Sequence, residues 1–203
     1  MKKYAVLHEP GDIVTLAGTR FVVLDVERRG SLPDSLFLLA LESVGASEFG
    51  SSNNYAESDL KKAVDKWLED MDKRGLDNAK LIPREIDLTT LDGSGCYGKL
   101  SVKAAPLTLD EAREYADIIP NAERWCWLAT GWSGPSKSDG DLALCVNSVG
   151  DWYSSLCSNS YGIRPALKAP SILFEDSEAG LDLSKIPTDD LLQEIHRRLA
   201  EKA

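Results

Sequence analysis

Short apolar runs bounded by turn residues dominate the first forty-three residues of the chain. A β-branched run from Phe21 to Val26 follows a turn at residues 17–19, and a second apolar run covers residues 35–43. Runs of this length that end near Gly are typical of buried strands rather than helices. The pattern therefore predicts a set of strands joined by short turns at the start of the chain.

Two segments have the spacing of amphipathic helices. In residues 58–71 apolar side chains recur every three to four positions behind Ser58, a favourable N-cap. In residues 108–119 Thr108 takes the cap position, acidic residues fill the first turn, and Pro120 ends the segment. Residues 81–107, between the helices, predict extended segments around a turn at 92–98. The body of the protein thus combines helices and strands.

From residue 121 the pattern changes to short strands and long loops rich in aromatic side chains. Four of the chain's five tryptophans fall between residues 125 and 152, and five glycines interrupt the region. Strands are expected near residues 124–129, 142–148, 151–155 and 163–167. Residues 152–161 follow no strict helical or strand period. Ligand contact is one reason for a segment to depart from core periodicity.

Residues 171–203 are predicted to form an appendage to the main domain. We expect a main domain over residues 1–170, an acidic linker over 171–187 and an amphipathic helix over 188–203, with Thr188 as its cap and one narrow apolar stripe. The helix over 188–200 can dock on its own domain, on a second copy of the chain or on another protein. The sequence leaves these alternatives open.

Composition limits the classes of partner. The net charge of −10 opposes direct binding to nucleic acid, because phosphate backbones attract clustered Lys and Arg. No apolar run is long enough to cross a bilayer, and the first residues lack the apolar region of a secretory signal. We therefore expect no membrane association, and a location in the cytoplasm or in an assembled particle.

The residues that usually carry chemistry are sparse. The four cysteines form no CxxC pair, the two histidines lie at opposite ends of the chain, and phosphate-binding glycine motifs are absent. We expect no metal, no cofactor and no catalytic residues. One enzymatic hypothesis remains, in which Cys145 and Cys157 approach across neighbouring strands as a redox or copper-binding pair.

Aromatic and small polar residues suggest a recognition surface instead. Trp132, Trp152, Tyr153 and Tyr161 have Ser, Gly, Asp and Asn as neighbours, a combination that provides large contact areas and adaptable hydrogen bonds. Trp127, by contrast, lies in an apolar strand and is assigned to packing. The sequence thus predicts a binding face within residues 130–161.

The order of these segments is similar to that of a known family. The succession "GDIVTLAGTRFVVLDVE", "SDLKKAVDKWLEDM", "APLTLDEAREY", "RWCWLATG", "LALCVNSVGDWY" and "GIRPAL" covers residues 11–168. It resembles a domain family of unknown function in Firmicutes and their phages, whose hallmarks are Trp-Trp-Leu-Arg-Ser-Pro, Val-x-x-x-Gly and a closing Gly-Val-Arg-Pro-Ala. This chain has "WCWLATG" at the first hallmark, without the Arg and Pro.

That family looks like a branch of the C-type lectin-like fold, which includes formylglycine-generating enzymes and retroelement-diversified receptor-binding proteins. The resemblance implies an α+β body with two helices, short strands and long loops. By analogy with the diversified relatives, ligand-contacting positions lie on one face, at Trp132, Ser133, Ser136, Ser138, Trp152, Tyr153, Ser155, Cys157, Asn159 and Tyr161. Calcium and sugar motifs of lectins are absent, and the catalytic features of the formylglycine enzymes have no counterpart.

The closing Gly-x-Arg-Pro matches the family at Gly162, Arg164 and Pro165. We expect these residues to be structural, with the Arg164 guanidinium bonded to backbone carbonyls or a buried acid and Pro165 fixing the entry of the last strand.

Three functions remain as hypotheses. The first is a noncatalytic phage or phage-like binding protein, itself a candidate for retroelement diversification, that recognises a protein or glycan. The second is an intracellular acidic phage inhibitor of a host defence or nucleic-acid enzyme. The third is an oxidase-like enzyme that uses the two cysteines.

Overall fold

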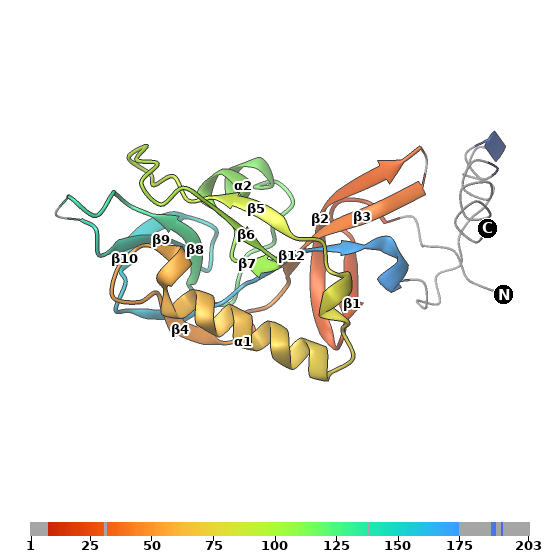
Figure 1. The fold of residues 1–203 in the computed structure, drawn as a ribbon, viewed down its shortest axis with the longest axis horizontal. Coiled ribbons are helices and arrows are strands. Elements are labelled where there is room, and N and C mark those ends of the chain that lie inside the picture. Colours follow the sequence, from red (N-terminus) through yellow and green to blue (C-terminus); the bar gives the residue numbers. More distant parts are fainter. Residues whose placement is uncertain (1–7, 31, 138, 175–187, 190–191, 193–203) are drawn as a thin grey trace.

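The computed structural model describes residues 8–30, 32–137 and 139–174, together with residues 188, 189 and 192 (Figure 1). Two α-helices, three short 3-10 helices and twelve strands make up this part of the chain. The fold is therefore mixed α+β and consists mostly of sheet, as the sequence pattern predicts. Most of the expected linker and terminal helix lies outside the described residues.

The first sheet has five antiparallel strands. In spatial order they are β1 (Ile13–Leu16), β2 (Thr19–Arg29), β3 (Leu32–Ala40), β12 (Ala166–Pro170) and β7 (Ala104–Ala105). The turn between β1 and β2 is tight because Ala17 and Gly18 both have positive φ, 47° and 77°. The first and last parts of the described body thus pair in one sheet (Figure 1).

The second sheet contains the aromatic region. Its spatial order is β10 (Trp152–Leu156), β9 (Leu142–Val146), β8 (Cys126–Gly131), β11 (Ser160–Gly162) and β4 (Ala46–Glu48). Only the β8–β11 pair is parallel. A third sheet of two strands is formed by β5 (Arg84–Asp87) and β6 (Lys99–Val102). Residues 163–165 therefore carry the chain from the second sheet into the first.

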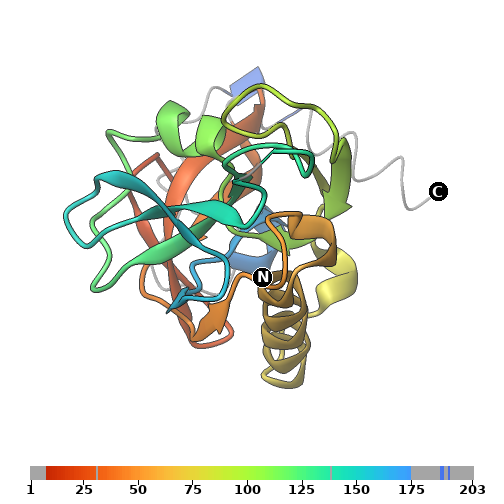
Figure 2. The ribbon, with the colours of Figure 1, turned by 90° about the vertical axis from the view of Figure 1, so that its left-hand side faces the viewer.

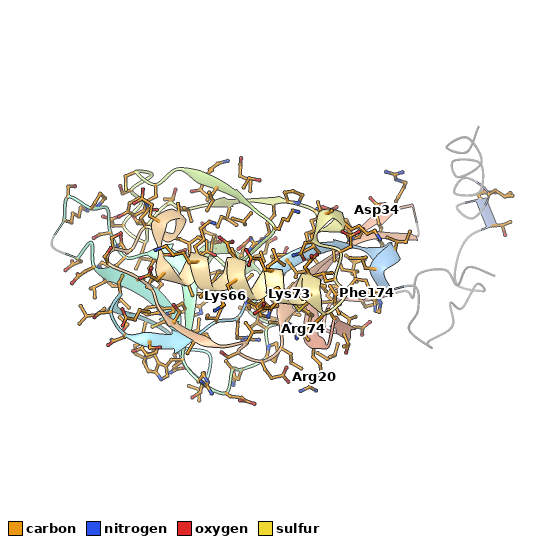
Figure 3. All side chains as sticks on the ribbon, turned by 60° about the horizontal axis from the view of Figure 1, so that its bottom comes forward. Arg20, Asp34, Lys66, Lys73, Arg74 and Phe174 are labelled. Atoms are coloured by element: carbon orange, nitrogen blue, oxygen red, sulfur yellow. The ribbon has the colours of Figure 1, made fainter. Side chains whose placement is uncertain are left out.

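Helix α1 (Asp59–Lys73) begins where the sequence predicts, since the Ser58 side chain accepts a hydrogen bond from the Lys61 N–H at 2.9 Å. It runs along the molecule and contacts β4 of the second sheet and β7 of the first (Figure 1). Charged side chains, including Lys66 and Lys73, are exposed along its length (Figure 3). Within the described residues, neither helix has the length and apolar character needed to span a bilayer.

Helix α2 (Leu109–Glu114) is shorter than expected. Thr108 and Glu111 form a complete capping box, which confirms the predicted start. The helix ends at Glu114 because Tyr115 leaves the helical conformation and its carbonyl accepts the N–H groups of both Ile118 and Ile119. Residues 115–119 therefore form turns.

Three 3-10 helices complete the described elements: η1 (Tyr55–Glu57), η2 (Asn78–Lys80) and η3 (Ser171–Phe174). The last falls within the segment expected to be a linker. Phe174 (Figure 3) is buried. Its ring lies 5.9 Å from that of His8 in an edge-on contact. The packed body thus extends to residue 174.

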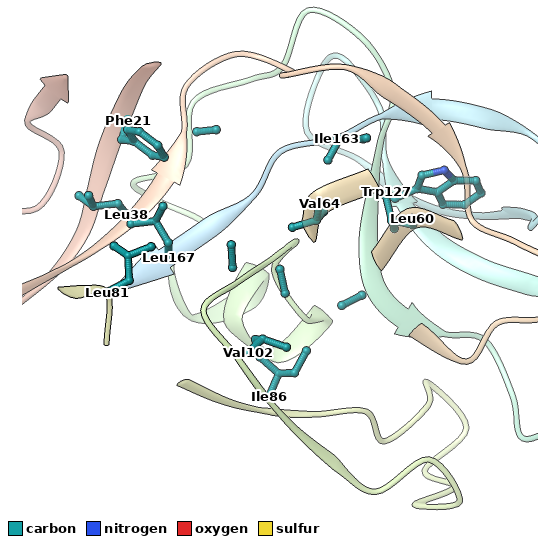
Figure 4. Close-up of a cluster of buried hydrophobic side chains, with 14 of the residues drawn as sticks. Phe21, Leu38, Leu60, Val64, Leu81, Ile86, Val102, Trp127, Ile163 and Leu167 are labelled. Carbon is teal, nitrogen blue, oxygen red and sulfur yellow. The ribbon is translucent and has the colours of Figure 1, made fainter. Parts of the chain in front are cut away.

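The main hydrophobic core lies between the two large sheets and α1. Phe21 and Leu38 of the first sheet, Val64 of α1, and Trp127 and Ile163 near the second sheet belong to one cluster (Figure 4). A smaller cluster lies under α2 and includes Leu39, so the two clusters occupy opposite faces of β3. The second sheet is likewise covered by protein on both sides along much of its length.

Candidate functional site

Strand β10 places Trp152 and Tyr153 on opposite faces of the second sheet. Trp152 pairs with Val146, and Tyr153 pairs with Cys145. Directly paired residues share a face, whereas successive residues alternate. Trp152 and Tyr153, both expected among the ligand-contacting positions of one face, therefore lie on opposite faces of the sheet, because β10 is a regular strand.

One face of the sheet carries a row of aromatic rings. The ring of Tyr153 lies 5.0 Å from that of Trp125, which lies 5.6 Å from Tyr161, and Tyr161 in turn lies 4.8 Å from the buried Trp127. These separations are those of favourable aromatic contacts. Tyr153 is 46% exposed, whereas Trp125 and Tyr161 are half-buried. The row thus joins the core to the surface.

Polar groups extend the same face. The Ser155 hydroxyl lies 3.0 Å from the Tyr161 hydroxyl and accepts a hydrogen bond from the Asn159 amide at 2.7 Å. We call Trp125, Tyr153, Ser155, Asn159 and Tyr161 the aromatic face. A shallow groove of about 400 Å³ lies beside it, with Trp125 and Tyr161 in its lining. Aromatic area and hydrogen-bonding groups are therefore available together.

The opposite face holds Trp132 and Trp152. Trp152 is 42% exposed and lies under the guanidinium of Arg113, 5.5 Å from the ring centre. Leu156 follows on the same side of the strand and is also exposed. Trp132 is half-buried and packs against the smaller core cluster. Its role is thus at least partly structural.

Two residues predicted to contact a ligand are buried and therefore do not belong to the candidate site. Ser133 and Cys157 are each 2% exposed. The backbone N–H of Cys157 is bonded to Asp141, and its carbonyl accepts from Phe49, so the residue is part of the packed interior. Ser136 is exposed in the loop after β8, and Ser138 lies outside the described residues.

Strand β10 forms an edge of its sheet, where backbone groups on the outer side have no strand partner in the described chain (Figure 2). Eight large hydrophobic side chains are exposed among the described residues, and half of them fall within residues 149–156: Val149, Trp152, Tyr153 and Leu156. The strand contains no Lys or Pro, which commonly protect an exposed edge. Exposed apolar surface therefore concentrates at this edge.

The residues expected to be structural all lie in packed surroundings. Trp127 is 1% exposed and its indole N–H donates to the Ser47 carbonyl at 2.9 Å. A Cβ on Gly162 would lie 2.8 Å from the Cys126 sulfur, which leaves no room for a side chain. Pro165 is buried, and its carbonyl accepts the N–H of Ala40.

Arg164 fastens the segment that crosses between the sheets. Its Nε donates to the Ala40 carbonyl at 3.0 Å and one terminal nitrogen donates to the Pro120 carbonyl at 3.1 Å. The other terminal nitrogen is buried without a hydrogen-bond partner. Backbone carbonyls or a buried acid were expected as acceptors for this guanidinium, and within the described residues the acceptors are backbone carbonyls.

Cys145 and Cys157 offer little nucleophilic or redox character. Burial raises the pKa of both Cys145 and Cys157 to about 12, so both are neutral thiols near pH 7. All four cysteines are free, and within the described residues no three His, Cys, Asp or Glu side chains are grouped to hold a metal ion. The hypothesis of a redox or copper-binding pair gains no support from this geometry.

Trp125 is a half-buried residue of the aromatic face that the sequence pattern does not predict to be part of the site. Its position two residues before Trp127 is the available signal, because a period of two places both rings on one face. Its contact with Tyr153 depends on strand pairing and is not visible in the sequence.

No family model, curated protein or solved structure matched this chain.

Proposed function

We propose that the chain is a noncatalytic binding protein that contacts a protein ligand through strand β10 and the aromatic face. The observation that carries the proposal is the exposed edge strand with its concentration of apolar side chains. An unprotected edge is a template for pairing with another chain, and most folded proteins shield such an edge. Its exposure here is consistent with a ligand that covers it.

An extended ligand segment would add to β10 as a further strand. Its backbone would supply hydrogen bonds, and its alternate side chains would reach Tyr153 on one face and Trp152 or Leu156 on the other. Ser155 and Asn159 provide adjacent polar contacts. A protein is favoured over a glycan because strand pairing needs a peptide backbone.

The finer assignment of fold and origin is part of the same proposal. Two α-helices, followed by a terminal region of short strands and loops, agree in order with the C-type lectin-like family that the sequence resembles. On that resemblance the protein is of phage or phage-like origin and a candidate for retroelement diversification. A reverse transcriptase and a near-repeat of the codons for residues 125–165 in the flanking DNA would support diversification.

The test is selection from a displayed library of extended peptides, followed by affinity measurement with the purified chain. Leu156→Lys adds a charge to the edge and Tyr153→Ala removes the exposed ring, and each should weaken the selected peptides at least tenfold. Ile13→Lys is the matched control, since Ile13 is 51% exposed on β1, the edge of the other sheet.

The control should bind within twofold of the unmodified chain, and all three variants should keep its unfolding midpoint. Failure to select any peptide, or equal loss in the Ile13 variant, would contradict the proposal. Binding that appears on a glycan array and depends on Tyr153, without peptide binding, would overturn the assignment to a protein ligand.

A further inference from the structure

A cavity of about 270 Å³ lies between the second sheet and the segment that follows α2. Its volume equals that of roughly nine liquid water molecules. The walls are mostly apolar and come from Leu107, Leu128 and Val146, with Trp152 and Val149 also in the lining. The face of β10 opposite the aromatic face thus borders a partly open cavity of small-molecule size.

Arg164 is the charged side chain in this lining. It is 7% exposed, and no carboxylate of the described residues lies within ion-pair distance of it. Two of its nitrogens bond to backbone carbonyls, and the third has no partner. A guanidinium stays protonated, so the cavity is bordered by a buried cation without a counter-ion.

The neighbouring groups do not neutralise that charge. Glu42 is the acid whose field acts on Arg164, but its carboxylate is paired with Arg20 at the surface. Cys126 also lines the cavity, and burial raises the pKa of its thiol to about 11, which keeps it neutral. Arg113 lies over Trp152, but its charge is paired with Asp110 at 3.4 Å, so Arg164 carries the unpaired positive charge of the lining. The electrostatics of the cavity therefore favour an anion.

We infer that this cavity binds a small organic acid, with its carboxylate directed toward Arg164 and its apolar body against the aliphatic walls and Trp152. A buried charge is costly unless it is paired, and a guanidinium matches a carboxylate in shape as well as charge. The size of the cavity selects acids such as a phenylpropanoate. This site is separate from the aromatic face and does not depend on the proposed function.

Calorimetric titration of the full chain with 3-phenylpropanoate and with its neutral analogue 3-phenylpropanamide provides the test. The acid should bind at least tenfold more tightly than the amide, because hydrogen bonds to charged groups are the stronger ones. The indole fluorescence of Trp152 should change on binding of the acid. Equal affinity for the two compounds, or no binding of either at millimolar concentration, would overturn the inference.

Variants at the rim test the site without disturbing Arg164, whose carbonyl contacts make its replacement a risk to folding. Val149→Asp places a negative charge near the mouth and should weaken the acid, whereas the nearly isosteric Val149→Asn should not; Val149 is 65% exposed. Ala116 is also exposed in the lining, and Ala116→Phe should block both compounds. Unchanged affinity in both Val149→Asp and Ala116→Phe would place the acid elsewhere.

Discussion

Replacement of Asn53 by Ala should be among the most damaging single changes outside the hydrophobic core. Asn53 is 1% exposed, and its amide donates to the carbonyls of Ser133 and Leu142, both at 2.9 Å. Its carbonyl oxygen accepts from the Tyr97 hydroxyl at 2.6 Å. One side chain thus ties the loop between β8 and β9 to the start of the helical region.

The cost follows from what each partner loses. The Leu142 carbonyl still accepts the N–H of Trp132, and the half-buried Tyr97 hydroxyl can reach water. The Ser133 carbonyl loses the amide in a buried site, which costs roughly 2 kcal/mol, and the other two bonds contribute about 0.5–1 kcal/mol together after exchange with water. Asn53→Ala should therefore lower the free energy of unfolding by about 3 kcal/mol.

Urea denaturation followed by tryptophan fluorescence measures this loss, which corresponds to a drop in Tm of roughly 6–12 °C for a domain of this size. Tyr97→Phe is the matched control, because it removes one bond and leaves both carbonyls paired; it should cost about 1 kcal/mol or less. Equal losses in the two variants, or a loss below 1 kcal/mol for Asn53→Ala, would refute the assignment of the buried amide as the main connection.

Three further predictions concern a buried charge and the buried thiols. Glu111→Gln keeps the helix cap but leaves the buried Arg84 side chain without its charged partner. The free energy of unfolding, measured with urea, should therefore fall by about 3 kcal/mol. A loss under 1 kcal/mol would contradict this prediction. A thiol reagent at pH 8 should label the exposed Cys96 rapidly in the native protein, and the remaining cysteines only after denaturation. In the native protein burial raises the pKa of the thiols of Cys126, Cys145 and Cys157 to about 11–12, whereas thiols of the unfolded chain ionise near pH 8.5. Above pH 8.5 the unfolded state therefore binds fewer protons than the native state, and the free energy of unfolding should fall as pH rises. A free energy of unfolding that stays constant from pH 8.5 to 10.5 would contradict this prediction.

The helix starts could be predicted because their signals are local. Ser58 and Thr108 each bond to a backbone N–H three residues later, so spacing alone identifies them. The early end of α2 could not be predicted from Pro120, because the turn at Tyr115 forms before that residue is reached. Local rules thus gave the beginnings of the helices more reliably than their ends.

The candidate sites depended on contacts distant in sequence. Residues 152–161 have no visible period because β10 has apolar side chains on both of its faces. Tyr153 belongs to the aromatic face, whereas Trp152 lines the cavity. The guanidinium of Arg164 donates to the carbonyls of Ala40 and Pro120, which lie 124 and 44 residues away in the sequence. No sequence pattern identifies these two partners. Composition predicts a binding region, whereas strand pairing decides which of its residues can act together.

Trp152 is the residue at which the two proposed sites meet. It belongs to the edge strand that a protein ligand would extend, and it also lines the cavity that contains Arg164. A ligand strand paired with β10 would cover the exposed part of this ring and so reduce its freedom to move away from the mouth. Because coupling between two binding sites is reciprocal, an acid that fixes the ring would favour the ligand strand to the same extent. Tyr153 points to the other face and gives the cavity no such connection, so any coupling should pass through Trp152 rather than through the aromatic face.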